Sequence, residues 1–431
     1  MKLAKVIPLH KKKSRLDAGN YRPVSILSVV SKVLEKAVFL QLNKYLVAHK
    51  LLYQFQSGFR GSYSTDTCLI HLQDHMREQI ASGKYIGMIL LDIQKAFDSV
   101  NHQILCKKLS AMGIQSTAWF NSYLSNRKQI VNINGVKSDP LALTCGVPQG
   151  SILGPILFLC YVNDMPSSVS CLMLQYADDS ALICSDKDPE KIGRVLRTNL
   201  ESCNKWLIEN RLSLHMGKTE LILFGTKRKL GKYNDYSIVM SDGNVIKSKH
   251  SVVYLGLELN RYLDGMEIAL NITKKVNSRL KFLYRQANFF NQKVKKTICS
   301  ALVLCLFDYS ISSWYGGISK YHPQRLQCAQ NKVIRFILQK DCMYHINHDD
   351  FETLGILNIS TRAEQLRLNH VFNIFYDICP DYMKGNFIKL SSLYNHDTRG
   401  RDFNFHVPKV KYVGSASFCH NAINIWNKLP K

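Results

Sequence analysis

The sequence lacks the segments that mark secreted and membrane-spanning chains. No apolar stretch follows the basic start MKLAKVIPLHKKK, so no signal peptide is predicted. The longest apolar run, ICSALVLCLF at 298–307, is much shorter than the roughly 20 residues that cross a bilayer. Internal repeats and low-complexity tracts are also missing. We therefore expect an intracellular protein, in the cytoplasm, the nucleus or both, with no membrane segment.

The cysteines show no pairing pattern. They are odd in number, 13, and scattered singly along the chain, which predicts reduced thiols. Cys342, His345 and His348 are spaced loosely like metal ligands, but no second ligand pair with zinc-site spacing accompanies them. The sequence therefore favours surface or packing roles for these three residues.

Negative charge is scarce. The chain carries 32 acidic residues against 57 Lys and Arg, which gives a net charge of +25. Such a surplus favours a polyanionic partner, because basic surface releases condensed counterions from nucleic acid on binding. The alternative is a merely soluble basic protein. With 431 residues, 46% of them hydrophobic, the chain can bury a sizeable core and form two or three domains.

Helical and strand patterns are both present. Apolar residues recur at helical spacing over 30–46, with charged and polar residues between them, and predict an amphipathic helix. A second helix is expected to begin near Thr65 or Asp66, either of which could cap it, and to end at about Ile80. Other predicted elements are a strand over 130–136, helices over 151–165 and from Asp188, a strand pair over 251–260, and basic-faced helices over about 266–340.

Two predicted strands end in carboxylates. The buried strand IGMILLD ends at Asp92, and Asp178 and Asp179 stand at a tight turn between the short strands LMLQY and SALIC. Neighbouring strands of one sheet could bring all three carboxylates together. Unit charges about 4 Å apart repel by roughly 4 kcal/mol at an effective dielectric of 20, so such a cluster needs protons or cations. Two Mg²⁺ ions would serve phosphoryl transfer, whereas an isolated Asp pair is most often a solvated turn.

These residues belong to a series of blocks that resembles the reverse transcriptases of non-LTR (LINE-type) retrotransposons, the Jockey-like branches in particular. YADD at 176–179 resembles the catalytic box, LLDIQKAFDSVNH at 90–102 the first carboxylate box, and CGVPQGSILGP at 145–155 the box between them. The remaining blocks follow in the same order: KVIPLHKKK with NYRPVSIL, QSGFRGSYSTDT, LSLHMGKTE and VYLGLEL. The resemblance covers about residues 3–260 and begins inside the first block. It implies an element truncated at its N-terminus, without the endonuclease domain.

The resemblance implies an α+β fold, the right-hand polymerase with fingers, a palm built on an antiparallel sheet, and a helical thumb. The fingers and palm would occupy residues 1–262, with the fingers near 1–85. The thumb would occupy 263–340. A C-terminal appendage of unknown role would follow over 341–431.

The resemblance also implies roles for single residues. Asp92 and Asp178 would hold two Mg²⁺ ions, or Mn²⁺ in their place, with Asp179 as a supporting carboxylate and the carbonyl of Ile93 as a further ligand. Lys218 would protonate the departing pyrophosphate as a general acid. The primer end would be gripped by Tyr254, Leu255 and Gly256.

The nucleotide side of the site follows from the same resemblance. Phe97 would be a steric gate that excludes a ribose 2′-OH, although an aromatic ring at this position could equally belong to the core. Gln149 and Gly150 would form the turn beneath the nucleotide and template base. Lys11 and Arg22 would clamp the triphosphate, and Lys12 and Lys13 are neighbours that could replace Lys11.

The implied function is an RNA-directed DNA polymerase that binds an RNA template, a DNA primer, their RNA–DNA duplex and dNTPs. An RNA-templated RNA polymerase shares the palm chemistry, but Phe97 argues against it. A catalytically silent nucleic-acid-binding remnant is the alternative from another class. The intact Asp92, Asp178, Asp179 and Lys218 favour catalytic competence over this alternative.

Overall fold

The computed structural model describes residues 2–11, 14–319, 321–393, 402–409 and 414–430. The chain has an α+β fold whose centre is a four-stranded antiparallel sheet in the order β7-β8-β3-β9. We call this sheet the palm sheet. Its strands are β3 (Tyr85–Asp92), β7 (Leu172–Tyr176), β8 (Asp179–Asp186) and β9 (Glu220–Phe224).

Helices cover both faces of the palm sheet, which explains why its strands are apolar on both sides. One core joins Ile89 and Leu91 of β3 to helices α5 (Leu153–Val162) and α6 (Pro189–Glu209). The other face packs against α2 (Thr65–Ala81). Helix α5 is buried along almost its whole length, and helices α3 (His102–Ala111), α4 (Thr117–Leu124) and α7 (Lys227–Leu230) complete this part.

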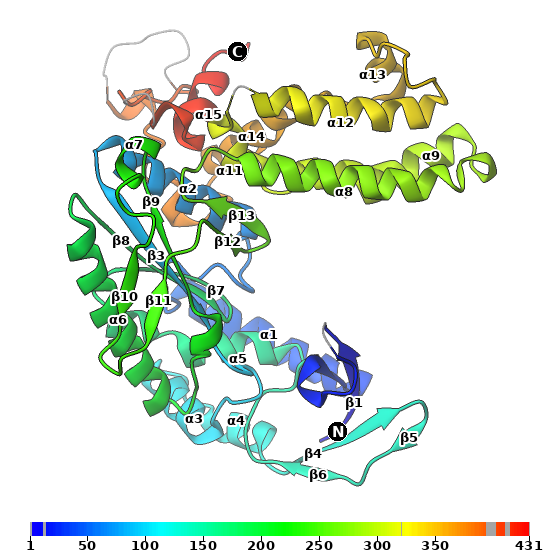
Figure 1. Cartoon of the computed structure of the whole chain (residues 1–431). Helices are drawn as coiled ribbons and strands as arrows, with labels where there is room; N and C mark the ends of the chain where they lie inside the picture. The colour runs from blue at the N-terminus through cyan, green and yellow to red at the C-terminus, as the bar shows by residue number, and fades with distance from the viewer. Residues whose placement is uncertain (1, 12–13, 320, 394–401, 410–413, 431) are drawn as a thin grey trace.

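A second sheet lies at the end of the molecule that carries the N-terminus (Figure 1). Strand β1 pairs antiparallel with β2 and parallel with β4, so residues 3–10 and 127–133 share one sheet. The strand predicted over 130–136 is divided by a turn between β4 and β5. The strands are β1 (Leu3–His10), β2 (Tyr21–Ile26), β4 (Arg127–Ile133), β5 (Val136–Lys137) and β6 (Leu141–Leu143).

Helix α1 (Val29–Ala48) confirms the helix predicted over 30–46, but its buried face differs from the apolar face of the sequence. Val30 and Val33 are 62% and 67% exposed, whereas Glu35 is 1% exposed. Glu35 is buried because its carboxylate has partners: it accepts hydrogen bonds from the backbone N–H of Ile152, at 2.7 Å, and from the hydroxyl of Tyr123, at 3.0 Å. Burial of a carboxylate is tolerated where hydrogen bonds satisfy it.

A helical part projects from the palm beside the C-terminal segment, and helices α8 and α12 run side by side in it (Figure 1). It follows two small hairpins, β10 (Ser237–Val239) with β11 (Val245–Lys247) and β12 (Ser251–Tyr254) with β13 (Leu257–Asn260). Its helices are α8 (Met266–Tyr284), α9 (Gln292–Cys299), α10 (Cys305–Asp308), α11 (Ile311–Trp314) and α12 (Tyr321–Leu338).

One stretch of this part, Gln292–Gly317, is long and apolar enough to cross a membrane by length and composition. Its helical backbone is interrupted at Tyr309 and Ser310, and Ser310 adopts a left-handed conformation with φ 50°. Val303, Phe307 and Trp314 are buried in the protein core. Core helices pass the same length and composition test, so the stretch is weak evidence for a membrane span.

The C-terminal segment is folded against helix α2 although its sequence shows no clear periodicity. It contains α13 (His348–Leu354), α14 (Ile359–Phe375) and α15 (Phe418–Trp426). A separate hydrophobic cluster joins Ile70 of α2 to Val371, Met383 and Phe418. The carboxylate of Asp74 accepts hydrogen bonds from the backbone N–H groups of Phe418 and Cys419, at 2.6 and 2.8 Å. It thereby gives partners to two N–H groups in the first turn of α15 that have none within the helix.

Candidate active site

The two neighbouring aspartates stand on a hairpin between β7 and β8, as predicted. Tyr176 pairs with Asp179, which leaves Ala177 and Asp178 as the two turn residues. Ala177 has a positive φ of 57°, a conformation that a tight hairpin turn requires. The flanking strands are buried, so the turn is fixed at the end of the palm sheet.

The third carboxylate reaches the same place from the adjacent strand. Asp92 is the last residue of β3 and is the register partner of Asp179 on β8. The following segment pairs with residues 213–215, because the N–H of His215 donates to the carbonyl of Asp92 at 2.8 Å. A short helical turn then places Lys218 Nζ 2.9 Å from Asp92 Oδ2.

Burial and neighbouring negative charge raise the pKa values of Asp178 and Asp179. Burial, together with the charges of Asp178 and Asp92, raises the pKa of Asp179 to about 6. Burial and Asp92 also raise the pKa of Asp178, whereas Arg22 and Lys11 oppose this rise. Two adjacent carboxylates that both resist ionisation need compensating positive charge when they are ionised. Oxygen ligands of this kind suit a hard divalent cation.

A cavity of about 670 Å³ opens in front of these carboxylates. It brings together residues from the palm sheet, the N-terminal sheet and the loop before α5. The predicted site residues that line it are Lys11, Arg22, Asp92, Ile93, Phe97, Gln149, Gly150, Asp178, Asp179 and Lys218. Lys12 and Lys13, the alternatives to Lys11, lie outside the described residues.

Phe97 lies in the wall of this cavity and is held by other rings. Its ring stacks on Phe158 of α5, with centroids 4.5 Å apart, and meets the edge of Phe59 at 6.2 Å. Phe97 is half-buried and packs against the core while it also lines the cavity. The gate and core interpretations are therefore compatible, because core packing fixes the ring that faces the cavity.

The Gln149–Gly150 turn is held against strand β2. The N–H of Ser25 donates to the carbonyl of Gln149 at 2.7 Å. Gly150 has φ 125°, and a Cβ at this position would lie 2.3 Å from the carbonyl oxygen of Ser25. Gln149 Nε2 donates to both carboxylate oxygens of Asp98, at 3.1 and 3.2 Å. No role for Asp98 was predicted from the sequence. In the structure, the Asp98 carboxylate orients the side chain of Gln149.

The residues predicted to grip the primer lie outside the cavity lining. Leu255 and Gly256 form the turn between β12 and β13, with φ values of 47° and 79°. The side chain of Tyr254 is 3% exposed and points into the core rather than toward the cavity, where its hydroxyl lies 3.9 Å from Cys68 Sγ. Tyr309 donates its hydroxyl hydrogen to the carbonyl of Leu255 and so joins α10 to this turn.

Gln56 supports the Ala177–Asp178 turn from behind, and it was not predicted as a site residue from the sequence. Its side-chain oxygen accepts the backbone N–H groups of Ala177 and Gly58, at 2.8 and 2.9 Å. The N–H of Ser57 donates to the carbonyl of Gln175 at 2.8 Å, so this loop lies along the edge of β7. The only signal for Gln56 in the sequence is its position in the block QSGFRGSYSTDT.

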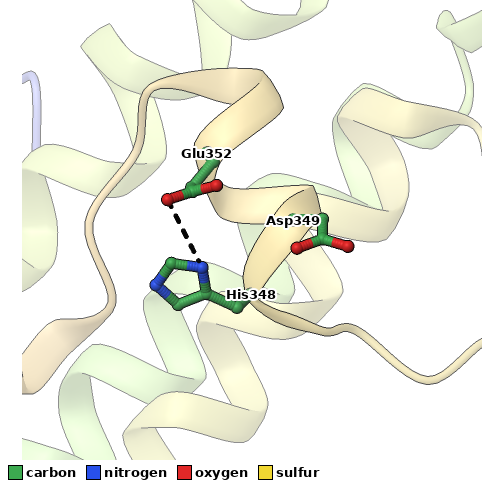
Figure 2. Close-up of side chains that lie close together, drawn as sticks. All are labelled: His348, Asp349 and Glu352. Atoms are coloured by element: carbon green, nitrogen blue, oxygen red, sulfur yellow. Dashed lines mark ion pairs between the residues drawn. The ribbon is translucent and has the colours of Figure 1, made fainter.

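A second group of possible ligands lies on helix α13 (Figure 2), outside the cavity lining. Among the described residues, His348, Asp349 and Glu352 bring their ligand atoms within 4.8 Å of one another. His348 Nδ1 is 3.5 Å from Glu352 Oε1. All three residues are exposed, and Cys342 and His345 do not join them. Exposed groups of this kind are common without an ion, so we assign no metal here.

The chain resembles known proteins over most of its length. Residues 9–259 match the family model described as "Reverse transcriptase (RNA-dependent DNA polymerase)". The chain belongs to the reverse transcriptase family. Members of this family generally use divalent metal ions, and the three clustered carboxylates fit that requirement.

Among curated relatives of this reverse transcriptase, "Probable RNA-directed DNA polymerase from transposon BS" of Drosophila melanogaster is 28% identical over 85% of this chain and 41% of its own length. "RNA-directed DNA polymerase from mobile element jockey" of the same species is 29% identical over 78% of this chain and 37% of its own length. The chain thus spans about two fifths of these relatives. A solved apo telomerase from Candida tropicalis aligns over 89% of this chain and 68% of its own, at 13% identity and a TM-score of 0.43.

Proposed function

We propose that this chain is an RNA-directed DNA polymerase that extends a primer 3′-OH with dNTPs along an RNA template, as in retrotransposon replication. The observation that carries the proposal is the cavity in which Asp92, Asp178 and Asp179 face the cations Lys11 and Arg22. Carboxylates on one side and basic groups on the other suit a nucleoside triphosphate with its metal ions. The names of the relatives from transposon BS and jockey support the same activity.

The carboxylates define the metal side of the proposed site. Asp92 and Asp178 would hold two Mg²⁺ ions, or Mn²⁺, with Asp179 beside them and the carbonyl of Ile93 as a further ligand. Bound ions of this kind activate an attacking oxygen and stabilise a leaving oxygen. The raised pKa values of Asp178 and Asp179 support this proposal, because a bound cation would offset both causes of the rise, their burial and the repulsion between neighbouring carboxylates.

The basic groups define the phosphate side. Arg22 would contact the triphosphate with two parallel hydrogen bonds, and Lys11 would add a point charge. Lys218 would protonate the departing pyrophosphate. Its ion pair with Asp92, at 2.9 Å, supports this role because it keeps the ammonium group at the rim of the carboxylate cluster.

The sugar and base would rest between Phe97 and the Gln149–Gly150 turn. A ring fixed by stacking on Phe158 cannot retreat from a 2′-hydroxyl, so dNTPs would be favoured over rNTPs. The expected preference for dNTPs favours a DNA polymerase over an RNA-templated RNA polymerase.

The product duplex would lie along the helical part. We assign fingers and palm to residues 1–262, a thumb to 263–340 and an appendage to 341–431. Exposed lysines on α8 and α12, among them Lys274, Lys281 and Lys332, would hold the phosphate backbone of an RNA–DNA duplex with little sequence readout. The backbone of the Tyr254–Gly256 turn would contact the primer end. We further propose that the protein works in the cytoplasm, the nucleus or both.

Primer extension tests the proposal directly. The purified chain is incubated with a primed RNA template and Mg²⁺, with dNTPs in one reaction and rNTPs in another. We expect extension with dNTPs that stops when EDTA removes the metal. Preferential extension with rNTPs would contradict the DNA polymerase assignment. Binding of RNA without metal-dependent extension would favour the silent remnant.

A further inference from the structure

The C-terminal segment touches the loop that supports the catalytic turn. Tyr382, between α14 and α15, places its hydroxyl 2.9 Å from Ser57 Oγ and 3.1 Å from Thr67 Oγ1. Its ring packs among Phe55, Tyr63 and His71, with centroids 6.0, 5.7 and 4.8 Å away. Burial raises the pKa of the Tyr382 hydroxyl, which therefore stays protonated and able to donate.

From Ser57, a chain of contacts continues to Ala177, the residue before Asp178. Ser57 is bonded through its backbone to Gln175 on β7, and its neighbour Gln56 holds the N–H of Ala177. A Cβ on Gly58 would lie 2.4 Å from the nitrogen of Ala177, so the loop and the turn are in close backbone contact. Asp178 follows Ala177 directly, and a displacement of the loop would therefore move this carboxylate.

We propose that Tyr382 is a positioning residue for the metal-binding carboxylate Asp178, and that the C-terminal segment is thereby a working part of the polymerase. The inference rests on the proposed function, which supplies both the metal that Asp178 would hold and the extension that is measured. Tyr382 acts through Ser57, Gln56 and Ala177. The segment that carries Tyr382 is anchored independently of the cavity, because Asp74 binds the start of α15 and Met383 enters the cluster around Ile70.

A conservative variant isolates the hydroxyl from the ring. Tyr382→Phe keeps the packing against Phe55, Tyr63 and His71 but removes both hydrogen bonds. A hydrogen bond of this kind contributes about 1 kcal/mol, so we expect the extension rate to fall about three- to tenfold and the half-saturating Mg²⁺ concentration to rise. Tyr376→Phe is the matched control, because Tyr376 lies on the same segment and is 55% exposed.

Metal binding is also measured without catalysis, as the rise in melting temperature that Mg²⁺ or Mn²⁺ produces. We expect Tyr382→Phe to need more metal for the same rise, and Tyr376→Phe to behave as the wild type does. In a double-mutant cycle, Ser57→Ala and Tyr382→Phe should be non-additive, because each substitution removes the hydrogen bond between Ser57 and Tyr382.

The outcomes separate this inference from the proposed function. A wild-type protein that binds metal but extends no primer contradicts the polymerase, while the metal titrations still decide the role of Tyr382. If Tyr382→Phe lowers the melting temperature but leaves the metal dependence and the rate unchanged, Tyr382 is merely structural and the inference is wrong. Additive effects of the Ser57 and Tyr382 substitutions would also overturn it.

Discussion

Replacing Gly150 with alanine should disable the proposed nucleotide site while the fold survives. The new Cβ would lie 2.3 Å from the carbonyl oxygen of Ser25, whereas ordinary contact begins at 3.4 Å. The Gln149–Gly150 turn must therefore move away from β2 by about 1 Å, a displacement that can lower a rate about 10²-fold when it misplaces reacting groups. The positive φ of 125° adds strain of about 1–3 kcal/mol.

Steady-state primer extension at varied dNTP concentration measures this effect. We expect kcat/KM to fall about 10²-fold in Gly150→Ala. Gly135→Ala is the matched control, because Gly135 also has a positive φ, 92°, but a Cβ there meets nothing within 4 Å. Gly135 lies in the turn between β4 and β5, outside the cavity lining. Equal activity of the two variants would refute the assignment of Gly150 to the nucleotide site.

Two further predictions concern the sugar and the metals. Phe97→Ala should lower the preference for dNTPs over rNTPs by at least about tenfold. Primer extension with the two kinds of nucleotide in competition measures this preference. An unchanged preference would show that Phe97 has only a packing role. Because the pKa of Asp179 is raised from 3.8 to about 6, the folded state binds this proton more tightly than the unfolded state does. The free energy of unfolding of the metal-free protein should therefore fall as the pH rises from 3.8 through about 6. Mg²⁺ should raise the melting temperature at pH 8 but little at pH 5. An equal rise at both pH values would contradict the carboxylate site.

Local patterns were sufficient for the elements that carry the carboxylates. The apolar strand before Asp92 and the two strands around Asp178 were predicted because strand length, apolar content and turn residues are all local properties. The helix start at Asp188 was predicted for the same reason, and its carboxylate accepts the N–H of Glu190 at 3.0 Å. The cap of α2 was placed slightly late, since Ser64 rather than Thr65 or Asp66 forms the capping box.

Contacts between distant residues could not be predicted in this way. Gln56 lies 121 residues from Ala177, and Ser57 lies 325 residues from Tyr382. Nothing in the local sequence around these residues indicates such partners, because the contacts exist only once the palm sheet and the C-terminal segment are folded. Glu35 shows the same limit: its sequence position suggests a solvated helix face, but long-range hydrogen bonds make it buried.

Asp178 lies at the centre of the proposed metal-dependent polymerase site. The most direct test of this site compares wild type and Asp178→Asn in Mg²⁺-dependent primer extension and, with the same protein, in binding to the primed RNA template. The substitution keeps the size of the side chain and removes its charge. We expect extension to be abolished while binding remains nearly unchanged. A variant that extends primers at the wild-type rate would contradict this expectation.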